Sequence, residues 1–496
     1  MSAAQVTPAQ RQSVRETFKR PAWLRTEILA GLVVALALIP EAIAFALIAD
    51  VDPKVGLYAA AVMAMSIAFV GGRPAMISAA TAATALVIAP VVASHGVQYL
   101  FATVILAGLL QIVFGFIGVA KLMRFIPQSV MTGFVNALAI LIFVAQLPDL
   151  IDVPWAVYPL FVLGLVIIFL WPRVSAAIPA PLVAIVVVTL IVIIFSIDVP
   201  TVADKGELPS ELPFFLIPDV PFTLETLQII LPAALTMAIV GLLESLMTAQ
   251  LVDNITDTPS NKTRESVGQG TSNILAGFFG GMGGCAMIGQ TMINVRASGA
   301  RTRLSTFIAG LSLMILAVGL GDIVGMMPMA VLVAVMVYVS YATFEWHSIA
   351  PRTLKNMPVS ETVIMLITVI PTVITGNLAV GVGLGVLAAM IAFVRHVSHF
   401  AHVKRDLDDD TARYLVTGQL FFASSHDLAN QFEYALDPDN VVIDLRQANI
   451  WDQSTAATLD AIHERYTERG KTVEFLGLRK PFPLGRSTTE APPTAN

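Results

Sequence analysis

Two glutamates lie within long apolar stretches of the sequence, where an ionisable side chain is costly. Glu41 belongs to the stretch 26–48, and Glu244 belongs to the stretch 224–251. A charged carboxylate at the centre of a membrane costs about 3 kcal/mol, so it is either protonated or faces a polar cavity. Because burial disfavours the ionised form, each could carry a proton across a membrane. We therefore predict that both couple proton movement to solute movement; the alternative is a neutral acid held by a helix-packing hydrogen bond.

Thr248 follows Glu244 by one helical turn and would lie on the same helix face. Its hydroxyl is therefore a possible cation ligand. A sodium site would favour a second carboxylate, so the sequence favours protons over sodium as the coupling ion.

Two short stretches of small and polar residues interrupt the apolar pattern. The first runs from Ser78 to Thr84, and the second runs from Gly280 to Thr291. Backbone N–H groups freed by a broken helix inside a membrane are tolerated only beside a cavity or a ligand. A half-helix N-terminus carries about half a positive charge and unpaired donors. The two breaks therefore predict an anion site; the alternative is close helix packing by small residues.

Small side chains at these breaks would let an anion approach the backbone, and neutral polar side chains would add hydrogen bonds. The predicted substrate-binding residues are Glu41, Phe45, Ser78, Ala79, Ala80, Thr81, Ile288, Gly289 and Gln290. No hydrolytic triad or nucleotide-binding motif is recognisable. We therefore predict neither enzymatic activity nor a metal or cofactor, and secondary rather than ATP-driven transport.

The composition indicates the class of protein that must hold these residues. Of 496 residues, 56% are hydrophobic and only 13% are charged, and the mean hydropathy is +0.78. Such a chain is a polytopic membrane protein. The net charge is −6 and no basic stripe occurs, which argues against nucleic acid as a partner. The single cysteine, Cys285, excludes an internal disulfide framework.

With about 20 residues as the length of a membrane span, the apolar segments form two series separated by the polar stretch 198–221. The first series, within 26–196, is 26–48, 56–70, 75–93, 97–119, 125–147, 154–171 and 178–196. The second, within 224–398, is 224–251, 264–280, 285–297, 303–320, 327–343, 358–374 and 377–398. The third member of each series is interrupted, so the sequence predicts an all-α transport domain over 26–398 with 14 transmembrane segments in a 7+7 arrangement.

Basic residues are concentrated in every second loop, as expected if those loops are the cytoplasmic ones. This alternation places both termini in the cytoplasm and inverts the second series relative to the first. Inverted repeats are typical of transporters, with the site at the repeat interface. We expect a multi-pass protein of the cell inner membrane, with residues 1–25 as a cytoplasmic segment.

After residue 402 the pattern changes to short β-like runs and a helix. The runs are 414–416, 420–422, 441–445 and 472–476, with a helix over 455–469. This pattern predicts a small α/β domain over 404–485. The last residues, 486–496, are rich in Pro, Thr and Ala and are expected to be a disordered tail.

Several motifs together resemble those of the SulP sulfate permease family, solute carrier family 26. The residues that carry the resemblance are Leu38–Ala46, Val55–Ala60, the interrupted third segment, Glu244-Ser245-Leu246, Asn273 with Gly277–Gly281, and Ser298–Thr302. The C-terminal region resembles the STAS domain of this family. Asp452-Gln453-Ser454 falls at the loop that bears a phosphorylated serine in bacterial anti-sigma-antagonist relatives; the transporter relatives do not imply phosphorylation here.

The resemblance implies a core domain of spans one to four and eight to eleven, which moves against a gate domain of the remaining spans. It places the anion between the third and tenth half-helices and implies a homodimer in the lipid bilayer. Many animal exchangers of the family have an arginine near the site, where this chain has Gln290-Thr291. The missing charge argues against plain chloride exchange and for proton coupling.

The predicted function is proton-coupled symport of a small dicarboxylate, such as fumarate, or of an inorganic oxyanion. Sodium-coupled transport of bicarbonate or sulfate is the first alternative. The second is a membrane sensor or scaffold that binds an anion and signals through the STAS domain.

Overall fold

The computed structural model describes residues 13–119, 126–174, 179–398, 402–408, 410–421 and 428–477. The chain divides into two compact units, residues 1–386 and 387–496. Residues 1–12 of the predicted cytoplasmic segment lie outside the described residues. So do the predicted tail, 486–496, and the last part of the predicted α/β domain, 478–485.

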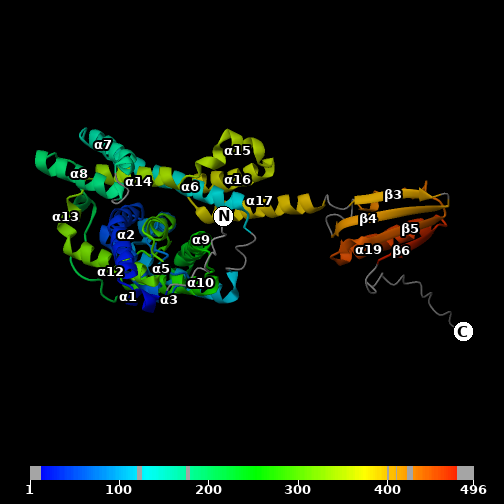
Figure 1. Cartoon of the computed structure of the whole chain (residues 1–496), viewed down its shortest axis with the longest axis horizontal. Helices are drawn as coiled ribbons and strands as arrows, with labels where there is room; N and C mark the ends of the chain where they lie inside the picture. The colour runs from blue at the N-terminus through cyan, green and yellow to red at the C-terminus, as the bar shows by residue number, and fades with distance from the viewer. Residues whose placement is uncertain are drawn as a thin grey trace, which may run out of the picture. The chain divides into compact units, whose positions relative to one another are not determined.

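The helices of the first unit, together with α17, which crosses its boundary, follow the predicted order (Figure 1). After the short α1 (Val14–Lys19), the first series is α2 (Pro21–Ile48), α3 (Pro53–Val70), β1 (Ser78–Ala79) with α4 (Ala82–His95), α5 (Val97–Ile117), α6 (Gln128–Gln146), α7 (Val157–Leu170) and α8 (Ala180–Phe195). The second series is α9 (Leu224–Thr256), α10 (Lys262–Phe278), β2 (Cys285–Ala286) with α11 (Ile288–Met292), α12 (Arg303–Gly319), α14 (Met329–Thr343), α16 (Val359–Thr375) and α17 (Leu378–Ser398). Short helices lie between them: α13 (Gly321–Gly325) and α15 (Pro351–Asn356).

Most of these helices have the composition of membrane spans. By length and composition, 6 of the described helices could cross a membrane: α2, α3, α5, α6 with the turn that follows it, α9 and α17. Shorter apolar helices are α4, α7, α8, α12, α14 and α16. In contrast, α10 is more polar and buries Gln269, Ser272 and Asn273. The exposed surfaces of α7 and α8 are apolar and include Val162 and Leu190, as expected of helices that face lipid.

The packing of these helices separates a core from a gate. In the core, α10 packs on α5 and α3, α12 packs on α2 and α3, and α9 packs on α4 and α5. In the gate, α14 packs on α6, α7 and α8, and α16 packs on α6. The core and the gate meet where α2 contacts α14 and α8, and where α4 contacts α6.

The segment between the two series, which we call the inter-repeat loop (residues 198–221), contacts both the gate and the core. Its first half bonds to the gate: Thr201 pairs with Pro328, and Lys205 Nζ lies 2.8 Å from Asp149 Oδ1. Its second half bonds to the core. Glu207 forms an ion pair with Lys54, and the hydroxyl of Tyr58 donates to the carbonyl oxygen of Glu211 at 2.8 Å.

Gly206 separates the two halves of this loop. Its φ angle is 156°, and an added Cβ would lie 2.5 Å from Asp52 Oδ1. Only glycine therefore allows the loop to pass so close to the core at the point where its contacts change from gate to core.

The predicted α/β domain forms the second unit's sheet, with strand order β3-β4-β5-β6. The strands are β3 (His402–Asp408), β4 (Thr411–Leu420), β5 (Asn440–Ile450) and β6 (Thr472–Leu476), and α19 (Gln453–Thr467) connects the last two. The first pair is antiparallel and the other two pairs are parallel. The predicted run 414–416 and Leu420 belong to one strand, β4, whereas residue 422 lies outside the described residues.

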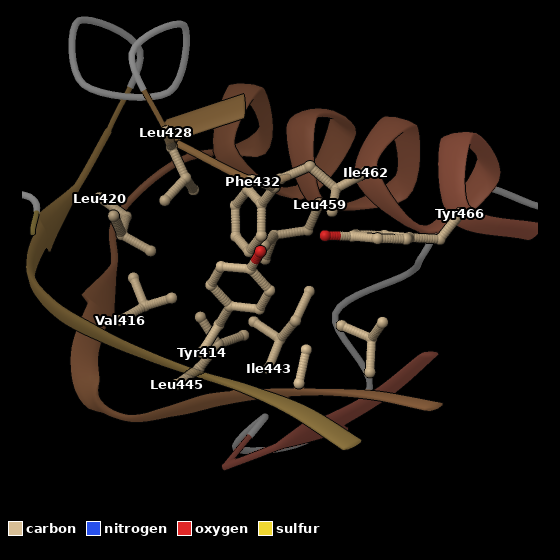
Figure 2. Close-up of a cluster of buried hydrophobic side chains, with 12 residues drawn as sticks. Tyr414, Val416, Leu420, Leu428, Phe432, Ile443, Leu445, Leu459, Ile462 and Tyr466 are labelled. Atoms are coloured by element: carbon tan, nitrogen blue, oxygen red, sulfur yellow. The ribbon is translucent and has the colours of Figure 1, made fainter. Parts of the chain in front are cut away.

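Two tyrosines in the core of this domain form hydrogen bonds to a buried carboxylate, Asp437. Figure 2 shows Tyr414 of β4 and Tyr466 of α19 among the apolar side chains between sheet and helix. Both tyrosine hydroxyls donate to Asp437 Oδ2, at 2.7 and 2.6 Å. Arg405 of the edge strand donates to Asp437 Oδ1 through Nε at 2.9 Å. Burial and the bond to Asp437 raise the pKa of Tyr466 well above its usual range.

We predict that Tyr466→Phe destabilises this domain by about 2 kcal/mol, because it removes a buried hydrogen bond to a charged group. The loss of stability is measured by hydrogen exchange of the backbone amides of residues 440–476 in the full-length protein, which should become faster. Tyr434→Phe is the matched control, since the Tyr434 hydroxyl donates at 2.7 Å to a neutral acceptor, the Ala429 carbonyl. Equal effects of the two substitutions would contradict the assigned role of Asp437.

The contact between α5 and α10 gives a second prediction. A Cβ on Gly108 would lie 2.5 Å from the carbonyl oxygen of Gly270, and a Cβ on Gly270 would lie 2.7 Å from Ile112 Cγ1. Gly270→Ala should therefore lower the stability of the first unit by about 2 kcal/mol through overpacking. Thermal unfolding in detergent measures this loss. Gly319→Ala, where no atom lies within 4 Å of the added Cβ, should leave the unfolding temperature nearly unchanged.

Candidate functional site

The two sequence interruptions pair with each other. Both were expected to be helix breaks, and each consists of a short strand followed by a half-helix. β1 and β2 are antiparallel, with Ser78 opposite Ala286 and Ala79 opposite Cys285. The pairing satisfies backbone groups that lipid could not, and it directs the N-termini of α4 and α11 to one region. A turn of π-helix (Ile293–Ala297) extends α11.

Buried side chains of the core hold this pair of strands. Asn273 of α10 bonds both backbone groups of Gly284: its Oδ1 accepts from the N–H at 2.8 Å, and its Nδ2 donates to the carbonyl at 3.1 Å. The hydroxyl of Ser245 on α9 accepts from the Ala286 N–H at 3.0 Å. An added Cβ on Gly284 would overlap the carbonyl oxygen of Ala79, so the close approach of the two strands requires glycine here.

A cavity of about 100 Å³ lies in front of the two half-helices, between core and gate. The core lines it with Glu41, Phe45, Thr81, Ala82, Glu244, Met287, Ile288 and Gly289, and the gate lines it with Phe134, Val135, Leu138, Ile142, Val339 and Thr343. None of these lining residues is basic. The electropositive groups at this cavity are therefore the N-termini of α4 and α11, which carry a partial positive charge.

Six of the predicted site residues line this cavity: Glu41, Phe45, Thr81, Glu244, Ile288 and Gly289. The other predicted residues are not part of its lining. Ser78 accepts a hydrogen bond from Gln269 Nε2 at 2.6 Å, and Ala79 is fully buried in the strand pair, with Ala80 1% exposed next to it. Thr248 donates to the Glu244 carbonyl at 2.8 Å, one turn earlier on α9.

The gate residues of the lining were not predicted. Those of α6 and α14 are apolar except for Thr343, and an apolar side chain facing a cavity has the same sequence signal as one facing lipid. Among the described residues, no group of three His, Cys, Asp or Glu side chains lies close enough together to hold a metal ion.

Each glutamate of the cavity receives one hydrogen bond from the segment 285–290. Gln290 Nε2 donates to Glu41 Oε1 at 2.9 Å, and the Cys285 thiol donates to Glu244 Oε2 at 2.9 Å. These donors are neutral, so they orient the carboxylates without balancing their charge. The cavity therefore holds two acidic groups beside two electropositive helix ends.

The comparisons with known proteins match nearly the whole chain. The family model of the sulfate permease family matches residues 24–159 and 151–368, and that of the STAS domain matches residues 405–482. The chain is 53% identical to the "Putative sulfate transporter YbaR" of Bacillus subtilis (strain 168), over 92% of this chain and 95% of that protein. It is 27% identical to the "Bicarbonate transporter BicA" of Synechocystis sp. (strain ATCC 27184 / PCC 6803 / Kazusa), over 92% of this chain and 88% of that protein.

Two solved structures are similar to the fold. The transmembrane domain of a cyanobacterium bicarbonate transporter BicA superposes with a TM-score of 0.63 at 27% identity, covering 74% of this chain and 97% of that one. The murine solute carrier 26 family member A9 anion transporter superposes with a TM-score of 0.78 at 16% identity, covering 96% of this chain and 91% of that one, which shows the fold alone. The names of these relatives describe anion transporters rather than enzymes.

Gly289 gives the test of this cavity. No atom lies within 4 Å of an added Cβ at this position, so a side chain there enters open space. We expect Gly289→Leu to fill the cavity and to weaken binding of sulfate or another small anion by more than about tenfold, with little loss of stability. Titration calorimetry of the purified protein measures the affinity. Gly289→Ala should retain most of it, and unchanged affinity in Gly289→Leu would place the anion elsewhere.

Proposed function

The chain belongs to the sulfate permease family, as its motifs predicted, and we propose that it is a secondary active transporter that carries a small anion together with protons. One observation carries the proposal: two glutamates and two helix N-termini meet at a cavity whose lining includes no basic residue. A carrier that moves an anion together with protons needs an acidic group whose negative charge is lost when it takes up a proton. Each glutamate can be such a group.

The magnitudes favour protonation over helix dipoles alone. Two like unit charges 4 Å apart repel by about 4 kcal/mol at an effective dielectric constant of 20. A helix N-terminus stabilises an anion by roughly 0.3–2 kcal/mol. Two such ends therefore do not offset the repulsion of an anion by two ionised glutamates. Uptake of a proton by Glu41 or Glu244 removes the repulsion from that glutamate, so anion and proton would bind together.

The position of the cavity supports transport by alternating access. Its core wall comes from α2, α4, α9, α11 and the segment before α11, whereas its gate wall comes from α6 and α14. Movement of the core against the gate would carry the anion and the two glutamates as one body. The opposite wall, which includes Phe134 and Leu138, would stay behind.

The substrate class follows from the cavity and from the relatives. A cavity of about 100 Å³ accepts several water molecules or one small anion. Neutral hydroxyl and backbone N–H donors suit an inorganic oxyanion such as the sulfate or bicarbonate of the relatives' names, or a small dicarboxylate such as fumarate. We further propose a homodimer in the inner membrane with both termini in the cytoplasm.

Sodium is the alternative coupling ion. Three oxygen atoms cluster beside Glu244: Thr248 Oγ1 lies 2.8 Å from the Glu244 carbonyl oxygen and 3.4 Å from that of Ala286. Hard cations prefer such oxygen ligands. A sodium-coupled transporter of bicarbonate or sulfate would use this cluster, and the omission of sodium distinguishes it from a proton-coupled one.

The deciding experiment is uptake of labelled sulfate, bicarbonate and fumarate into liposomes that contain the purified protein. We expect accumulation that requires an inward proton gradient and persists without sodium. Accumulation that requires sodium would show that sodium, rather than the proton, is the coupling ion. Binding without accumulation under any gradient would favour the sensor that signals through the STAS domain.

The glutamates give a prediction for the same assay. Glu244→Gln should abolish accumulation driven by the proton gradient, because the side chain keeps its shape but can no longer exchange a proton. Glu225→Gln, an exposed glutamate in the first turn of the same helix, is the matched control and should retain uptake. Unchanged gradient-driven uptake in Glu244→Gln would contradict proton coupling through this residue.

A further inference from the structure

A chain of hydrogen bonds connects Glu244 to the N-terminus of α4 behind the cavity wall. Cys285 Sγ lies 2.9 Å from Glu244 Oε2 and 3.2 Å from Thr81 Oγ1. Thr81 Oγ1 in turn lies 3.1 Å from Thr84 Oγ1. Glu244 and Thr81 line the cavity, whereas Cys285 is fully buried and does not. The thiol therefore joins two groups that an anion in the cavity would meet.

The direction of this chain is free to change. Hydroxyl and thiol hydrogens can rotate, and either atom of the Thr81–Cys285 pair can be the donor. When Glu244 is ionised, the thiol donates to its carboxylate and Thr81 donates to the sulfur. When Glu244 is neutral, the thiol can donate to Thr81 Oγ1, and the Thr81 hydroxyl can then donate into the cavity.

Charge decides between the two directions. A hydrogen bond to an ionised acceptor is roughly twice as strong as one between neutral groups. The hydrogens of the chain therefore turn toward whichever end is negative, the Glu244 carboxylate or an anion beside Thr81. Each group keeps its own hydrogen, and the one proton added is the proton that Glu244 takes up from solution.

We propose that Cys285 is a positioning residue through which Glu244 and the transported anion compete for the same hydrogen bonds. This inference rests on the proposed proton coupling and assigns its physical route. Because such coupling is reciprocal, protonation of Glu244 strengthens anion binding at Thr81, and anion binding favours a protonated Glu244.

Besides the direct repulsion between an ionised glutamate and the anion, the surroundings of Glu244 leave few other hydrogen-bonded routes for this coupling. Among the described residues, Glu41 on α2 and Cys285 on β2 are the titratable groups that share its cavity or bond to it. The hydrogen-bonding side chains of α4, α5 and α10 around β2 are neutral: Thr81, Thr84, Gln111 and Asn273. Glu41 has its own donor, Gln290, so its protonation would not turn the Cys285 chain.

The test is the apparent KM of uptake at pH 6 and pH 8 in proteoliposomes, with whichever of labelled sulfate, bicarbonate or fumarate the wild-type protein accumulates. Wild type should bind the anion more tightly at the lower pH. We define the KM ratio as the KM at pH 8 divided by the KM at pH 6. Cys285→Ala should reduce this ratio by about fivefold, because without the thiol no hydrogen bond connects Glu244 to Thr81. Cys285→Ser, which restores a donor and acceptor, should keep the ratio.

Ser245→Ala is the control for a merely structural effect. It removes the hydrogen bond to the Ala286 N–H on the same strand but leaves the chain intact, so the KM ratio should stay. If the KM of the wild type depends on pH and Cys285→Ala has the same KM ratio, the role of Cys285 is overturned. Proton coupling then still stands. A wild type without pH dependence would overturn the proposed function and this inference with it.

A second pair of variants covers the case in which Cys285→Ala does not fold. Thr81→Val removes the cavity end of the chain and should lower the KM ratio as Cys285→Ala does, whereas Thr81→Ser keeps a hydroxyl and should preserve it. Equal ratios in these two variants would also reject the proposal.

Discussion

The pairing of β1 with β2 is the constraint on which the site depends. It joins two segments that are more than 200 residues apart with only two residue pairs, Ser78 with Ala286 and Ala79 with Cys285. Inside a membrane these backbone groups have no water to bond, so they must bond each other or the side chains around them. Ser245 and Asn273 complete this set. Because each half-helix begins within three residues of the end of its strand, the N-termini of both reach the same cavity.

The two glutamates at this cavity are held by hydrogen bonds rather than by ion pairs. The donors to Glu41 and Glu244 are an amide and a thiol, both neutral. A lysine or arginine in their place would fix each glutamate in its ionised form. A neutral donor leaves the glutamate free to exchange a proton: the amide of Gln290 can stay beside Glu41 in either protonation state, whereas the thiol of Cys285 can turn from Glu244 to Thr81.

The parts of the site that are exceptions to their surroundings were predictable from sequence. Glu41 and Glu244 are acids in apolar stretches, and the breaks at Ser78 and Gly280 are polar interruptions of the same stretches. Leu138 and Val339 were not predictable, because they are apolar residues in apolar helices and only packing brings them to the cavity. The strand pairing was missed for a similar reason: a strand of two residues has no periodicity. In the C-terminal domain, short β-like runs predicted β4, β5 and β6 but not β3, and the role of Asp437 depends on side chains from three separate segments.

The inter-repeat loop sets a limit on how far the core and gate can separate near its ends. Lys205 is bonded to the gate and Glu207 to the core, and only Gly206 lies between them. Two extended residues span about 7 Å of backbone, so a separation beyond the reach of this backbone and its ion-paired side chains must break one of the two ion pairs. Exposed ion pairs weaken as salt is added, since the Debye length falls from about 10 Å at 0.1 M to about 3 Å at 1 M. We therefore expect the ionic strength of the medium around this loop to affect the proposed movement of the core against the gate.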